Sequence, residues 1–182
     1  MDWAWDGGRL SLDLVNTYRD RKTGGRETLR EPTDLTAWLA AAGHPGVSAG
    51  EELLDRTRAL RDAVSGCVDA VLAGSPSAPA DVDLVNTWAS RRRPPVLQLA
   101  PDLSLLRLAA PDPGAAALAE IAHDAVELLG GDDRYHLRVC ASPICGLRFV
   151  DRSNAGRRQW CSMRRCGNRE KVRLHRARLK DG

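Results

Sequence analysis

The 182-residue sequence has no long hydrophobic run. None of its apolar stretches approaches the roughly 20 residues that a membrane-spanning helix needs. Its opening segment, Met1 to Asp6, carries acids where a secretory signal would have Lys or Arg followed by an apolar stretch. Apolar residues make up 43% and charged residues 28% of the chain, the balance of a soluble globular protein. We therefore expect a cytoplasmic protein with no membrane partner.

The sequence also lacks the short motifs that carry common catalytic chemistry. Its glycine pairs have no GxGxxG or GxxxxGK[ST] context, and HExxH and GxSxG do not occur. His44 and His123 have no second ligand-type residue nearby. We predict no catalytic residues and no enzymatic activity, although a pocket in the first part of the chain could still bind a small-molecule effector. Asn16, directly after an apolar stretch, could contact such a ligand; the alternative is a buried amide satisfied by backbone groups.

Charge is distributed unevenly along the chain. Residues 138–182 hold 13 Lys and Arg residues against three acids, a net charge of +10, whereas the first 137 residues hold 14 against 21, a net charge of −7. A tail this basic can neutralise phosphates, and such asymmetry within one chain is a pointer to nucleic-acid contact. Double-stranded DNA is the partner that we expect.

The cysteines are divided in the same way. Cys67 stands alone within an apolar stripe, which is typical of a small buried core residue. The other four form the pattern C-x4-C-x15-C-x4-C in the basic tail: Cys140, Cys145, Cys161 and Cys166. Disulfides rarely persist in a reducing cytoplasm, so clustered cysteines indicate metal ligands.

Four thiolates with no open position are typical of a structural zinc site, and we expect one Zn²⁺ per chain. An iron–sulfur cluster and unrelated thiols or disulfides are the alternatives, and His136 or His175 could replace a cysteine as ligand. A turn at Ser142-Pro143 would let Cys140 and Cys145 converge from a β-hairpin. Cys161 and Cys166 cannot both ligate from a regular helix, since residues five apart are offset by about 140°. One of them must lie in the turn that leads into a C-terminal helix.

The first 133 residues are predicted to be mostly helical. Thr33 is the expected N-cap of one helix, and Ser48 with Glu51 has the spacing of a capping box ahead of the longest apolar stripe. Two further helices are expected at 82–89 and 114–129, with a β-hairpin over 96–108 between them. The predicted fold class is mainly α with a small β-hairpin (α+β): a helical domain over 1–133 and a four-cysteine finger of hairpin and helix over 134–182. We expect the helical domain to fold without the finger, because its stripes need nothing from beyond residue 133.

The expected C-terminal helix, residues 168–179, carries a row of cations. Arg169, Arg173, Arg176 and Lys180 recur at i, i+4, i+7 and i+11 and would form one stripe suited to a groove or a phosphate backbone. With Arg164 and Arg165 beside the second cysteine pair, the expected DNA contacts are Arg164, Arg165, Arg169, Arg173 and Arg176.

The tail resembles the CGNR zinc finger. The residues that carry the resemblance are Arg138 to Cys140, Cys145-Gly146, Phe149 to Asp151, Arg158 to Met163, Cys166-Gly167-Asn168-Arg169 and Lys171 to His175. The segment Gly8 to Thr17 is similar to the opening of the ABATE domain, which precedes this finger in bacterial proteins described as stress-induced transcriptional regulators. The resemblance implies that the four cysteines bind zinc and that the finger binds DNA.

Two functions follow from these patterns. The first is a DNA-binding transcriptional regulator, stress- or ligand-responsive, whose acidic helical domain senses a ligand, forms a homodimer or contacts the transcription machinery. The alternative is a zinc-stabilised interaction module that binds RNA or an acidic protein. Readers of single-stranded RNA usually display aromatic platforms, and here only Tyr135, Phe149 and Trp160 are present. We expect Phe149 and Trp160 to pack around the metal instead.

Overall fold

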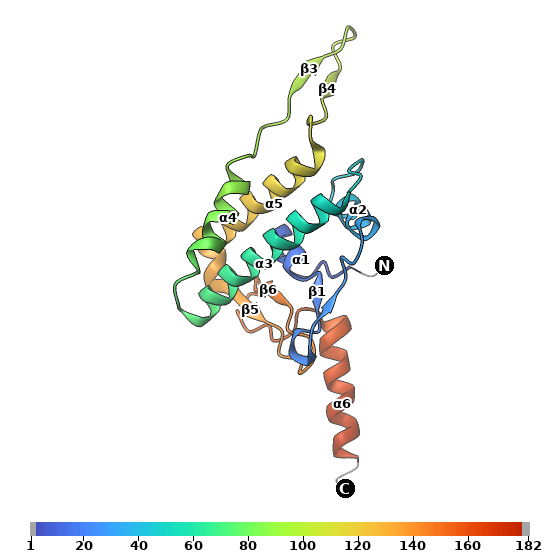
Figure 1. Cartoon of the computed structure of the whole chain (residues 1–182). Helices are drawn as coiled ribbons and strands as arrows, with labels where there is room; N and C mark the ends of the chain where they lie inside the picture. The colour runs from blue at the N-terminus through green and yellow to red at the C-terminus, as the bar shows by residue number, and fades with distance from the viewer. Residues whose placement is uncertain (1–2, 180–182) are drawn as a thin grey trace.

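The computed structural model describes residues 3–179 and shows a helical body, a projecting hairpin and a terminal helix that points away from the body (Figure 1). The helices of the body are α1 (Leu10–Val15), α2 (Pro32–Ala41), α3 (Glu51–Ala73), α4 (Pro79–Ala89) and α5 (Pro113–Gly130). The predicted fold class, mainly α with small antiparallel hairpins, is confirmed. No helix within residues 3–179 is long and apolar enough to cross a membrane.

The apolar stripe of α3 organises the core. Leu54, Leu60, Val64 and Val68 of this helix are fully buried and pack with apolar residues of α1, α4 and α5. Cys67 lies on the same helix and is 4% exposed, as expected for a core residue. Gly74 ends the helix in the left-handed conformation at φ 65°, which a glycine adopts without strain.

The predicted starts of two helices are wrong. α2 begins at Pro32, so Thr33 lies in its first turn and is not the N-cap; Asp34 instead accepts a hydrogen bond from the backbone N–H of Glu31 at 3.3 Å. Proline is favoured at this first helical position because its missing N–H would be unpaired there. α3 begins at Glu51 after extended Gly50, so Ser48 does not cap it. The chain before α3 stays extended, with Val47 buried and the Ala49 N–H donating to Thr36 Oγ1 at 3.0 Å.

Three small antiparallel strand pairs complete the described chain. β1 (Tyr18–Arg19) pairs with β2 (Arg26–Glu27), with the short helix η1 (Arg21–Thr23) between them. β3 (Leu97–Leu99) pairs with β4 (Leu105–Arg107) in the predicted hairpin. β5 (Leu137–Val139) pairs with β6 (Arg148–Val150), and the short helix η2 (Asp132–His136) joins α5 to β5.

The finger shares the core of the helical body. Leu137 and Val150, one from each strand of the β5–β6 hairpin, are 2% exposed and belong to the same apolar cluster as α3 and α5. The Val150 N–H donates to the Gly7 carbonyl at 2.9 Å. The helical stripes therefore pack with residues from beyond 133, and independent folding of the helical domain stays a prediction. A hairpin this small has an apolar face that it cannot bury by itself, and it buries that face against the helices.

Candidate metal centre and cationic surface

The β5–β6 hairpin positions the first cysteine pair. Cys140 follows β5 directly, and its N–H donates to the Leu147 carbonyl at 2.9 Å, which continues the ladder by one bond. Between Cys140 and Cys145 the chain turns, and Gly146 closes the turn at φ 71°, in the left-handed region that favours glycine. The turn predicted at Ser142-Pro143 therefore brings both thiols to the same end of the hairpin.

The second cysteine pair lies where the chain enters the terminal helix. Met163–Gly167 form one wide π-helical turn, η3, directly before α6 (Asn168–Arg178). Ser162 stabilises this turn because its carbonyl accepts from the N–H groups of Cys166 and Gly167 at 2.9 and 3.0 Å. Cys161 precedes the turn and Cys166 lies within it, as the five-residue spacing predicts.

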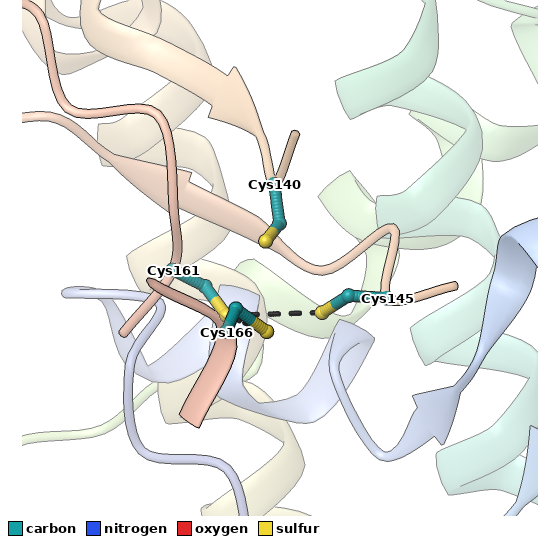
Figure 2. A group of neighbouring side chains, drawn as sticks. All are labelled: Cys140, Cys145, Cys161 and Cys166. Atoms are coloured by element: carbon teal, nitrogen blue, oxygen red, sulfur yellow. Dashed lines mark hydrogen bonds between the residues drawn. The ribbon is translucent and has the colours of Figure 1, made fainter. Parts of the chain in front are cut away.

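The four thiols converge in one buried cluster (Figure 2). Their sulfur atoms all lie within 4.8 Å of one another, with Cys145 Sγ 3.7 Å and Cys166 Sγ 3.6 Å from Cys161 Sγ. A tetrahedral site with Zn–S bonds of about 2.3 Å separates its sulfurs by about 3.8 Å. All four cysteines are free thiols, and the cluster includes neither His136 nor His175. The donor set and its spacing therefore fit one tetrahedral Zn²⁺.

The thiols perturb one another strongly. Hydrogen bonding from Cys145 lowers the pKa of Cys140 to about 2, and the same hydrogen bond raises the pKa of Cys145 to about 12. Hydrogen bonds to Cys140 and Cys145 likewise raise the pKa of Cys161. One thiolate is thus stabilised by the protons of its neighbours, and the four thiols cannot all ionise together without repulsion. A divalent cation offsets this repulsion and lets every thiol ionise.

Apolar side chains seal the cluster on its inner side. Phe149 is fully buried, and it packs with Ala4, Trp160 and the cysteines in a small second core, as expected for Phe149 and Trp160. Arg158 stacks over the Phe149 ring at 4.6 Å and donates through Nη2 to the Cys161 carbonyl. This packing fixes the backbone that carries the metal ligands.

The structure separates the five predicted DNA contacts into two groups. Arg165 forms an ion pair with Asp6, and Arg173 pairs with Glu170 at 2.8 Å. Arg164, Arg169 and Arg176 have exposed side chains, and Arg173 is 58% exposed despite its ion pair. Glu170 is 7% exposed and accepts a hydrogen bond from buried Ser142 at 3.4 Å, so the acid of α6 faces the finger. Lys180, the last position of the predicted stripe, lies outside the described residues.

Sequence reasoning missed a basic loop of the helical body that contacts the finger. Lys22 donates through Nζ to the carbonyls of Cys140 and Ser142 at 2.7 and 3.0 Å. Arg19 and Arg26 line a cavity of about 120 Å³ beside the cysteine cluster, together with Arg165 and Arg169. The signal was present in the sequence, since residues 19–26 form a basic segment within an otherwise acidic part.

Asn16 lies at the junction between body and finger. Its side chain is 1% exposed, donates through Nδ2 to the Arg148 carbonyl at 2.8 Å and accepts from the Arg148 N–H at 3.0 Å. The amide thus pairs with β6 as a neighbouring strand would. This geometry favours the alternative of a buried amide satisfied by backbone groups over contact with a ligand.

Comparison with protein families assigns both parts of the chain. The CGNR zinc finger model matches residues 136–179. The ABATE model, described as "Putative stress-induced transcription regulator", matches residues 8–132, more than half of the chain. The chain belongs to the ABATE family. Its C-terminal part is a CGNR zinc finger, with one Zn²⁺ as its cofactor. A comparison with curated proteins finds no match.

Proposed function

We propose that this ABATE–CGNR protein is a DNA-binding transcription regulator without catalytic activity that acts in the cytoplasm. The observation that carries the proposal is the cationic surface of η3 and α6, where Arg164, Arg169, Arg173 and Arg176 are exposed while Glu170, the acid of the same segment, is buried. Arginines in this arrangement can neutralise the phosphates of duplex DNA or read guanine in the major groove.

In this proposal, Cys140, Cys145, Cys161 and Cys166 ligate the zinc ion. The bound metal supplies structural cross-linking and offsets the charge of the thiolates. The finger's own residues then set the direction of α6, because Ser162 holds the turn before the helix and Glu170 bonds to Ser142 in the cysteine turn. The cationic face is therefore held at a fixed angle to the hairpin.

The aromatic residues of the finger favour duplex DNA over single-stranded RNA. Phe149 is fully buried, and Trp160 packs against the cysteine core. Tyr135 is 62% exposed, but it lies at η2 with Arg134 stacked on its ring at 4.6 Å. Stacking of successive bases needs several exposed rings on one surface.

Fluorescence anisotropy of the zinc-loaded full chain with labelled duplexes tests the proposal. We expect affinity to fall with salt at a log–log slope of roughly −0.9 per neutralised phosphate. Replacing a phosphate-contacting arginine, as in Arg169→Ala or Arg176→Ala, should reduce that slope by about 1 and weaken all sequences alike. Replacing a base-reading arginine should instead cost about 1–3 kcal/mol of binding free energy, and only on one preferred DNA site. We expect smaller effects at Arg165 and Arg173, whose guanidinium groups are engaged with Asp6 and Glu170.

The matched control is Arg56→Ala on α3, an exposed arginine that pairs with Glu52 on the helical body. This variant should bind every duplex as the native chain does. Failure of the zinc-loaded chain to bind any duplex at low salt, with tight binding to an acidic protein instead, would establish the interaction module in place of the regulator.

Effector binding to the helical body is a further part of the proposal. A cavity of about 250 Å³ lies between α3, α4 and α5, with Cys67, Val71, Val85 and Leu129 in its wall. Its apolar lining suits a small apolar molecule better than a charged one. Asn16 does not line this cavity.

A further inference from the structure

The β3–β4 arm, residues 96–108, projects away from the helical body on the side opposite to α6 (Figure 1). Its apolar side chains are 42–78% exposed. They are Val96, Leu97, Leu99, Leu103, Leu105, Leu106 and Leu108. Exposed apolar side chains in this number on one projecting hairpin mark an interaction site.

Among residues 3–179, no other strand supports the arm. Every residue of β3 and β4 is exposed, and within this described part the two strands pair only with each other. An isolated two-stranded hairpin is marginally stable in water. Both faces of the arm, and both of its outer edges, are therefore open to an apolar partner that would stabilise it.

A mostly apolar groove, able to accept an apolar projection, lies at the root of the arm. This groove of about 920 Å³ runs between the two chain segments that lead into and out of the arm and the start of α5. Its lining is mostly apolar and comes from Pro94, Pro95, Val96, Leu108, Ala109, Ala110, Pro111, Ala115 and Ala116. One chain thus carries an apolar projection and an apolar groove in adjacent positions.

Charge is placed asymmetrically along the arm and its root. At the tip, Asp102 accepts hydrogen bonds from the Ser104 N–H and hydroxyl at 3.0 and 2.6 Å. At the root, Arg92 and Arg93 are exposed and line the groove, and Arg91 stacks on Trp88 at 4.5 Å. Asp112 and Glu120 also line the groove, so its arginines outnumber its acids by three to two. An arm that lies antiparallel to this one would bring its acidic tip to the arginines of the groove.

We propose that the arm binds a second copy of this chain. In this dimer the two arms lie antiparallel about a two-fold axis, so that each tip enters the other copy's root groove. Such an interface is self-complementary, as a two-fold contact requires. The exposed apolar residues of the arm offer on the order of 700 Å² per copy over its two faces, of which the partner arm covers one face and the tip, and the root groove supplies the remaining contact area.

Light scattering after size exclusion, on the zinc-loaded full chain without DNA, tests the dimer independently of the proposed DNA binding. We expect twice the chain mass of 19.8 kDa. The double variant Leu99→Asp with Leu105→Asp should elute as a monomer, because it places charges on the arm. The matched control is Leu72→Asp on α3, a residue 37% exposed away from the arm, which should stay dimeric. Zinc content and far-UV circular dichroism show whether each variant is folded.

A charge exchange between tip and root distinguishes a second copy from any other partner. Asp102→Arg alone and Arg92→Asp with Arg93→Asp should each weaken the dimer, since like charges would then meet. An equimolar mixture of the two variants should restore it, because each tip then meets an opposite charge on the other chain. A native chain that is monomeric at about 100 µM, arm variants that remain dimeric, or a mixture that stays monomeric would each overturn the proposal.

Discussion

Asp13 on α1 is an acid in an environment that disfavours its charge. Burial and, to a smaller extent, the nearby charge of Asp124 raise its pKa to about 7, against the hydrogen bond that Asp13 Oδ1 accepts from the Gly7 N–H at 2.9 Å. The folded chain therefore holds this proton more tightly than the unfolded chain, in which the pKa is near 3.8. It follows that the contribution of Asp13 to stability falls as the pH rises from about 4 to 7.

We expect Asp13→Asn to stabilise the protein by about 1–3 kcal/mol above pH 7, since one pKa unit corresponds to about 1.4 kcal/mol. The amide oxygen still accepts from Gly7, and the gain should vanish near pH 4. Urea unfolding of both proteins at pH 4, 6 and 8 measures the difference. The control is Asp55→Asn on α3, whose side chain is 74% exposed and should change stability little at any of these pH values. A loss of stability in Asp13→Asn at pH 8 would mean that the charge is favourable.

Cys161 interacts with all three other thiols of the cluster, and it is fully buried. We expect Cys161→Ser to lower zinc affinity by more than about 100-fold, because even loss of a group behind a metal ligand costs 10–100-fold. Competition with a chromophoric chelator measures this change. Cys67→Ala is the matched control and should keep full zinc content, since Cys67 lies in the core of α3. Unchanged zinc content in Cys161→Ser would remove this residue from the ligand set.

At the scale of elements, Asn16 joins the end of α1 to β6. Asn16→Ala leaves both the N–H and the carbonyl of Arg148 without this partner, and each buried group left unpaired costs about 1–3 kcal/mol. We therefore expect a loss of about 2–4 kcal/mol in the free energy of unfolding, measured by urea titration. Asn86→Ala on the exposed side of α4 is the control and should cost far less. Equal effects of the two substitutions would show that the junction does not depend on the Asn16 amide.

The elements divide into those that the sequence predicts and those that it does not. Periodic apolar residues correctly predict α3, α4 and α5, and the stop at Gly74 is correct. The starts at Thr33 and Ser48 are wrong because several residue types can cap, and tertiary contacts such as the burial of Val47 decide among them. The pairing of β1 with β2 has no periodic signal, since each strand contains two residues.

The whole molecule depends on the finger more than the sequence predicts. The spacing of the four cysteines is enough to predict that they form one cluster, because four ligands of a single metal ion can be arranged in few ways. The packing of the finger against the helices cannot be predicted in this way. Leu137 and Val150 are apolar residues that could equally well have packed inside the finger, and the sequence does not show that they pack against the helical body. Lys22 of the basic loop also donates hydrogen bonds to the cysteine turn, which lies far from it in the sequence. No local sequence pattern predicts such a long-range contact. The boundary between 133 and 134 stays a prediction.

We expect zinc removal to destabilise the entire chain and not the tail alone. The metal site holds the β5–β6 hairpin, and this hairpin contributes Leu137 and Val150 to the core of α3 and α5. Thermal unfolding followed by far-UV circular dichroism, with and without chelator, should show a lower midpoint for the helical signal. Chelation of Cys67→Ala should have the same effect. An unchanged midpoint of the helical transition would restore the idea of a helical domain that folds alone.

The projection of α6 has a consequence for the stability of the helix itself. The start of this helix is held by Glu170 and Ser142, while the rest of it extends away from the body (Figure 1). Arginines at spacings of three and four repel one another along such a helix. An anionic surface relieves that repulsion, so DNA that contacts α6 also stabilises the helix itself. Salt screens the same repulsion in the free chain, so this part of the gain is smaller at high ionic strength.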